Sequence, residues 1–186
     1  MKSRIAVAIL LGLSACACSV ADSTSGPSVV PPSPVPSPVS VRVPPTFPGG
    51  FFITVNNVPR HWAGGPFIHC FSNEAYERPF ADTLSGLSGI PWSKGTDSST
   101  CNVVWTPFTE AQHTYVNIGG TPTDLLHAEL HYKVNTPAPY ILHELGHILG
   151  LDHSTVDSDL MNANQRPSLT WFSQSEVAAI RWTYRQ

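Results

Sequence analysis

The chain has 186 residues, enough for one ordinary domain with appended segments. Hydrophobic residues make up 41% of it, as in most globular proteins, whereas charged residues make up only 12%. The formal net charge of −3 and the lack of a long basic run argue against a nucleic-acid-binding protein. Histidine is abundant for such a weakly charged chain, with 8 His against 10 Lys and Arg, so the places where histidines cluster are informative.

The first residues have the pattern of an export signal. Lys2 and Arg4 form a basic start, and residues 5–13 form an apolar stretch that is too short to span a bilayer. This stretch ends in Leu13-Ser14-Ala15-Cys16, which resembles a bacterial lipobox. We therefore predict a lipoprotein-type signal peptide over residues 1–15, with a lipid carried on the thiol of Cys16 after cleavage.

An ordinary secretory signal, cut between Ala15 and Ala21, is the alternative interpretation. The sequence favours the lipid anchor, although Leu-x-x-Cys is a short pattern that arises easily by chance. In both cases we expect the protein to be exported. With a lipid it would reside at the outer membrane or cell surface, and without one it would be secreted.

Proline dominates the segment that follows. Nine of the 18 prolines fall between residues 27 and 48, interleaved with Ser and Val, and the segment carries only two charged residues, Asp22 and Arg42. Such a composition cannot bury a core, and it favours the extended polyproline conformation. At about 3.1 Å per residue, some thirty residues would extend on the order of 100 Å. We predict that residues 16–50 form a disordered stalk.

The folded domain is predicted to cover residues 51–186. Residues 51–55, Phe-Phe-Ile-Thr-Val, are typical of a first strand. Residues 72–87 are predicted to form a helix, with Ser72 or Asn73 as its N-cap and with Glu74 and Glu77 in its first turns. Residues 102–105 and 114–118 are short runs that predict further strands.

The second half of the domain contains one more strand pattern and two helix patterns. Apolar residues recur at every second position of residues 127–134, which predicts a half-exposed strand: Ala128, Leu130, Tyr132 and Val134. Pro137 and Pro139 suit the first turn of a helix. Ser173 and Glu176 form a capping box that opens a last helix over residues 173–184. The order of these elements predicts an α+β fold with a mixed sheet.

Two cysteines lie inside the predicted domain, Cys70 and Cys101. Export makes disulfides permissible, and these are the only two cysteines of the folded part. We expect them to pair, with two buried free thiols as the alternative.

One segment of the domain concentrates the histidines. Residues 143–153 read His-Glu-Leu-Gly-His-Ile-Leu-Gly-Leu-Asp-His. On a helix, residues four apart lie about 40° apart around the axis and about 6 Å apart along it, so His143 and His147 project from one face toward a common point. Gly150 suits the left-handed residue that ends a helix, after which the chain can return His153 as a third ligand.

Three neutral imidazoles at this spacing are a typical ligand set for one catalytic zinc ion, with a fourth position left for water. Zinc would lower the pKa of that water, and Glu144 would take its proton as a general base. Five fixed positions make the pattern far more specific than the His-Glu-x-x-His core alone. The alternatives are histidines on a solvated helix face and a metal site without catalysis, and Glu144 argues against the second.

The complete pattern, His-Glu-x-x-His-x-x-Gly-x-x-His followed by a Met-turn, resembles the metzincin zinc peptidases, with Met161 in the turn. Ser154 directly after the third histidine, the Leu160-Met161 pair and residues 173–184 resemble the matrixin branch. The resemblance implies a twisted mixed sheet, an active-site helix, a Met-turn and a C-terminal helix. It also implies that Met161 is a hydrophobic base under the metal; a plain core methionine is the alternative.

The resemblance further implies a metalloendopeptidase that hydrolyses peptide bonds in a cleft between sheet and zinc. An extended peptide would pair with the strand at the rim of that cleft, for which residues 114–119 are the candidate. Residues 162–172 would wall the pocket for the side chain that follows the scissile bond.

The chain also departs from the matrixin pattern. It has no Pro-Arg-Cys-Gly type cysteine switch, so we expect no zymogen of that kind. His113, His127 and His131 do not match the arrangement that holds a second, structural zinc in matrixins, so we expect one catalytic Zn²⁺. Binding of Ca²⁺ is possible, but no feature of the sequence supports it.

The partners expected from these patterns are few. The substrate would be a protein or peptide, no nucleic acid would bind, and the membrane would be contacted only through a lipid at Cys16. We expect a monomer. The main alternative function is a surface-displayed zinc-binding lipoprotein without turnover, which the predicted anchor and stalk would also suit.

Overall fold

The structure is a computed structural model that describes residues 52–55, 58–109, 113–164 and 168–184. The predicted signal peptide, the lipidation site at Cys16 and the predicted stalk lie outside these residues. Within the described part of the chain, no helix is long and apolar enough to cross a membrane.

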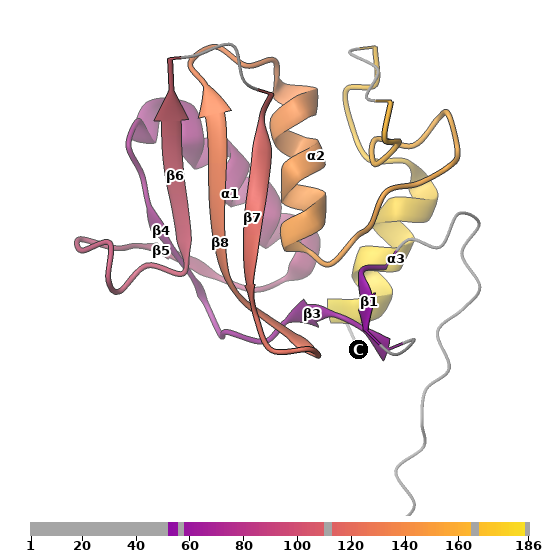
Figure 1. Ribbon diagram of the computed structural model, residues 1–186, viewed down its shortest axis with the longest axis horizontal. Coiled ribbons are helices and arrows are strands. Elements are labelled where there is room, and N and C mark those ends of the chain that lie inside the picture. The colour runs from indigo at the N-terminus through magenta and orange to yellow at the C-terminus, as the bar shows by residue number, and fades with distance from the viewer. Residues whose placement is uncertain (1–51, 56–57, 110–112, 165–167, 185–186) are drawn as a thin grey trace, which may run out of the picture. The chain divides into compact units, whose positions relative to one another are not determined.

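A mixed sheet forms one layer of the domain (Figure 1). Its strands are β3 (His61–Trp62), β4 (Phe67–Cys70), β5 (Trp92–Lys94), β6 (Val103–Phe108), β7 (Tyr115–Gly120) and β8 (Asp124–Lys133). β8 is central, because it pairs in parallel with β3 and β6 and antiparallel with β7. β4 continues the sheet in parallel between β6 and β5. β1 (Thr54–Val55) and β2 (Val58–Pro59) form a separate antiparallel pair.

The described residues contain three helices, α1 (Glu74–Ser88), α2 (Ala138–Ile148) and α3 (Gln174–Tyr184). α1 and α2 lie on the same side of the sheet in Figure 1. Along β8 the inward residues alternate with outward ones as predicted for Ala128, Leu130 and Tyr132, which are fully or almost fully buried. The prediction was wrong for Val134, which lies beyond the end of β8 and is 53% exposed. The predicted α+β fold with a mixed sheet is therefore confirmed.

The first part of the domain differs from the sequence-based prediction in three respects. The predicted strand over residues 51–55 is reduced to Thr54–Val55, and Phe51 lies outside the described residues. β2, β3, β4 and β5 were not predicted, because each is a short run without clear alternation. Asn73 occupies the N-cap position of α1 but its side chain caps nothing; instead its backbone N–H donates to the Glu77 carboxylate over 2.9 Å.

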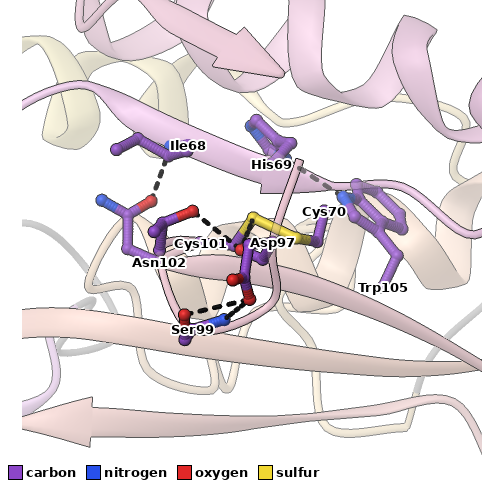
Figure 2. Close-up of a disulfide and its surroundings, with 9 residues drawn as sticks. Ile68, His69, Cys70, Asp97, Ser99, Cys101, Asn102 and Trp105 are labelled. Carbon is purple, nitrogen blue, oxygen red and sulfur yellow. Dashed lines mark hydrogen bonds between the residues drawn. A yellow bond between two sulfur atoms is a disulfide. The ribbon is translucent and has the colours of Figure 1, made fainter. Parts of the chain in front are cut away.

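A disulfide joins Cys70 at the end of β4 to Cys101 just before β6, with their Cα atoms 5.7 Å apart (Figure 2). This is the pairing that the sequence favoured. The neighbouring His69 is fully buried, and the Trp105 indole N–H donates to its Nδ1 over 3.0 Å. Burial lowers the pKa of His69 to about 4, so the ring is neutral near pH 7. The disulfide thus connects two core strands beside a buried aromatic cluster.

Removing the disulfide should destabilise the domain without rearranging it. The bond links residues separated by 31 positions, and closing a loop of that size in the unfolded chain contributes about 2–4 kcal/mol. We therefore expect the double variant Cys70→Ser, Cys101→Ser to lose about this much unfolding free energy in urea titrations. A reductant should destabilise the unaltered protein and leave the double variant unchanged. Equal stability of the two proteins would contradict the account.

Candidate metal centre

The helix that carries the motif begins and ends where its sequence requires. Pro137 is the N-cap of α2 and Pro139 lies in its first turn, where a missing backbone N–H costs nothing. Gly150 has φ 86°, the left-handed conformation that glycine adopts without strain. A Cβ at Gly150 would also collide with the carbonyl oxygen of Arg60. The chain can therefore turn sharply at this point only because residue 150 is glycine.

This turn brings the three predicted ligands together. Each of His143, His147 and His153 offers one ring nitrogen, and these three nitrogens all lie within 4.8 Å of one another. The ring centroids are 4.9 to 5.3 Å apart. His143 is buried, His147 is half-buried and His153 is exposed, so the cluster is open to solvent on one side. The three histidines are the sole cluster of this kind among the described residues.

Two backbone carbonyls set the orientation and tautomer of two of these rings. Nδ1 of His143 lies 2.8 Å from the carbonyl oxygen of Leu160, and Nδ1 of His147 lies 2.8 Å from that of Leu151. A carbonyl can only accept, so each Nδ1 carries the proton and donates it. The lone pair is then on Nε2 of both rings, which is the form in which a histidine binds a metal.

The surroundings keep these imidazoles neutral. Burial lowers the pKa of His143 to about 4, against a smaller raising effect of its hydrogen bond to Leu160. Burial likewise lowers the pKa of His147. Zinc binds only neutral imidazole, so near pH 7 no proton has to leave these rings before a metal enters. The donor set, three nitrogens with at least two aligned in advance, fits zinc with an open fourth position.

Met161 lies against the helix that carries the ligands. It is fully buried, and a Cβ at Gly146 would collide with its Sδ atom. Gly146 stands between two histidines of the motif, His143 and His147, and next to the second. The ring of Phe172 reaches the same spot, 3.2 Å from where that Cβ would be. The small residue at position 146 therefore lets Met161 pack directly against α2 beside His147.

The segment after His153 is fixed by a buried hydrogen-bond network. The Ser154 hydroxyl donates to the Asp159 carboxylate over 2.6 Å, and the Ser154 N–H donates to the Met161 carbonyl over 2.8 Å. Ser154 and Asp159 are 3% and 1% exposed, so water does not compete for these bonds. The serine that resembled the matrixin pattern thus ties the third ligand to the Met-turn. Asp159 was not singled out in the sequence.

Glu176 anchors the Met-turn from the third helix. Its carboxylate accepts the backbone N–H of Leu160 over 3.1 Å and that of Met161 over 2.7 Å. It also accepts the Ser173 N–H over 2.6 Å, while its own N–H donates to the Ser173 hydroxyl, so the predicted capping box is present. The sequence indicated the cap, but nothing in it indicated contacts to residues 15 and 16 positions away.

The remaining predicted residues have definite positions. Glu144 is 5% exposed on α2, directly after the first ligand. β7 lies beside α2 (Figure 1). Among the described strands, β7 pairs with β8 alone. His131 lies on the sheet, with its Nε2 atom 3.3 Å from Oε1 of Glu129. His113, His127 and His131 do not belong to the cluster of three histidines. Residues 165–167 of the predicted pocket wall lie outside the described residues.

Comparison with known protein families agrees with this geometry. The family model of the matrixins (Peptidase_M10) matches residues 105–185, which extend from β6 past the end of α3 and include all three histidines. The resemblance to matrixin-like metzincins is thereby confirmed for this part of the chain. No curated protein matches the chain.

Glu176 provides a test of how the Met-turn is held. In Glu176→Ala, the buried N–H groups of Leu160 and Met161 lose their acceptor, which should lower the unfolding free energy by about 3 kcal/mol. Because the Leu160 carbonyl orients His143, zinc affinity should also fall, by about tenfold. Glu129→Ala, at a half-buried glutamate on the sheet, is the matched control and should change neither quantity much. Urea titration measures the unfolding free energy, and chelator competition measures the zinc affinity.

Proposed function

We propose that the protein is an exported zinc metalloendopeptidase whose zinc is held by His143, His147 and His153. The observation that carries this proposal is the convergence of three imidazole nitrogens, all within 4.8 Å of one another, inside a segment that matches the matrixins. A zinc ion bound there would act as a Lewis acid, lowering the pKa of a water molecule and polarising a peptide carbonyl. The protein's own residues then have to position the substrate and move protons.

Glu144 is the residue proposed to move the proton. It directly follows the first proposed ligand on α2, and it is 5% exposed. As a general base it would accept a proton from the attacking water and then donate it to the leaving nitrogen of the cleaved peptide bond. A hydrolase of this kind needs no nucleophilic serine or cysteine.

The proposed substrate is an extended stretch of protein or peptide chain. β7 supports this, because its second edge is unpaired among the described strands and the strand runs beside α2. Backbone N–H and C=O groups at such an edge can pair with an added strand whatever its side chains. We propose that the substrate binds along β7 in this way, which would place its backbone between the sheet and the metal centre.

Export and anchoring are proposed from the sequence of the first 50 residues. The basic start, the short apolar stretch and the sequence Leu-Ser-Ala-Cys support a lipid at Cys16, and the proline-rich composition supports a stalk between that lipid and the domain. The disulfide between Cys70 and Cys101 agrees with an oxidising compartment outside the cytoplasm.

The catalytic proposal predicts separate effects on turnover and on zinc binding. Glu144→Gln should lower kcat for an unfolded protein substrate by about 10²–10⁴-fold, because a general base contributes this much. Zinc should still bind in one equivalent, because the three histidines are intact. Glu74→Gln, at a glutamate that pairs with Lys94 on the surface, is the matched control and should retain full activity.

The same assay includes removal of the metal. A chelator should abolish cleavage by the unaltered protein, and added zinc should restore it. Cleavage that survives both the chelator and the substitution of Glu144 would overturn the proposed mechanism. Tight zinc binding without cleavage of any member of a peptide library would instead favour the zinc-binding lipoprotein without turnover.

The anchor can be tested with two cysteines that lie only two positions apart. If Cys16 carries the lipid, Cys16→Ala should move the full chain from the membrane fraction to the soluble fraction of an expressing bacterium, because the acyl chains are lost. Cys18→Ala is the matched control and should stay in the membrane fraction. Equal partitioning of the two variants would contradict a lipid at Cys16.

A further inference from the structure

The turn that follows α2 is held by a side chain far away in the sequence. The Leu149 carbonyl, at the C-terminal end of α2, accepts a hydrogen bond of 3.0 Å from the Tyr184 hydroxyl. The same hydroxyl accepts the backbone N–H of Trp62 over 2.8 Å. The last residue of α3 thus connects the end of the metal-binding helix to β3. Such a carbonyl at a helix end has no partner within its own helix, so an outside donor determines where it points.

The Tyr184 hydroxyl is well suited to this role. Burial raises its pKa well above the ordinary value of a tyrosine, so it is protonated and able to donate at any physiological pH. A hydroxyl can donate one hydrogen bond and accept others, and this one does both. Substitution by phenylalanine would remove both bonds and leave the Trp62 N–H and the Leu149 carbonyl without this partner.

The turn held by Tyr184 affects two of the proposed zinc ligands, one before it and one after it. Two residues after Leu149, the carbonyl of Leu151 accepts the Nδ1–H of His147 and so orients that ring. The N–H of Leu151 donates to the carbonyl of Gly146 over 2.9 Å. His153 follows two residues later and is the exposed ligand, so its position depends on the course of this turn.

The N-terminal part of the domain contacts the same turn from another element. The Ile53 N–H donates to the Gly150 carbonyl over 2.8 Å, and Phe52 forms an isolated bridge with Leu151. The Arg60 N–H in turn donates to the Ile53 carbonyl. These contacts fix Gly150 and Leu151, whereas Leu149 depends on Tyr184. The turn is therefore held at three consecutive residues by two different parts of the chain.

We propose that Tyr184 is a positioning residue for the metal centre: its hydroxyl fixes the Leu149 carbonyl, and thereby the turn that orients His147 and presents His153. This inference rests on the proposed zinc site and extends it to a residue that contacts neither the metal nor the substrate. It follows that loss of one hydroxyl at the end of α3 loosens zinc binding beyond its effect on stability.

The test compares two tyrosine substitutions of the same kind. Tyr184→Phe removes the hydroxyl that bonds Leu149, and Tyr76→Phe removes one that donates to the Thr136 carbonyl over 2.7 Å, before α2 and away from the three histidines. Both substitutions delete a part-buried hydroxyl that donates to a backbone carbonyl, so both should reduce stability. We expect Tyr184→Phe alone to weaken zinc binding, by about threefold to tenfold in chelator competition with the full chain. Loss of a group that hydrogen-bonds a ligand directly lowers metal affinity by about 10–100-fold, and Tyr184 acts one step further from the ligands.

A second readout concerns the geometry of the site. With Co²⁺ in place of zinc, Tyr184→Phe should change the visible absorption bands of the bound ion, whereas Tyr76→Phe should leave them as in the unaltered protein. Equal zinc affinities and identical Co²⁺ spectra in all three proteins would overturn the inference and leave the proposed zinc site standing. If the unaltered protein bound no zinc, the proposed function itself would fail, and the inference with it.

A measurement on the unaltered protein covers the case in which Tyr184→Phe does not fold. Coupling between two sites is reciprocal, so if Tyr184 positions the ligands, zinc must stabilise the contacts of Tyr184. Hydrogen exchange at the Trp62 N–H, which donates to Tyr184, should slow by about threefold or more when zinc is added, the same factor as the affinity change. Unchanged exchange there, with slower exchange on α2, would contradict the inference.

Discussion

The candidate metal centre depends on two backbone carbonyls that orient histidine rings. The carbonyls of Leu160 and Leu151 accept the Nδ1–H groups of His143 and His147, which leaves both Nε2 atoms available to bind a metal. Each carbonyl belongs to a turn, and a turn by itself holds a carbonyl only loosely. Much of the hydrogen bonding near the site therefore serves these two turns: Glu176 holds the turn at Leu160, and the turn before Leu151 has contacts to Tyr184 and Ile53.

Two glycines make these arrangements sterically feasible. At position 146, any side chain would displace Met161 from beneath the ligand helix, and at position 150 it would meet the Arg60 carbonyl and force a left-handed conformation on a residue with a Cβ. The motif therefore contains two kinds of requirement. The histidines supply ligand atoms, whereas the glycines allow the Met-turn and the N-terminal segment to approach closely enough to hold those ligands.

The sequence predicted the parts of the fold that depend on local patterns. The start of α2, the capping box of α3 and the alternation along β8 are each encoded within about ten residues, and the structure has all three. β4 and β5 were missed because they are short and gain their order from pairing with each other and with β6. At the site, spacing alone indicated the three histidines. The contacts of Glu176, Asp159 and Tyr184 connect residues brought together by the fold, and no single-sequence pattern contains them.

If the site prepared by these turns holds zinc as proposed, three imidazoles bind one ion. X-ray absorption at the zinc K edge of the zinc-loaded full chain, with the metal content determined on the same sample, can measure this. We expect one zinc per chain with three imidazole nitrogens at about 2.0–2.1 Å and one further light ligand. Sulfur in the first coordination shell, fewer than three imidazoles, or an unchanged spectrum in His153→Ala would contradict it.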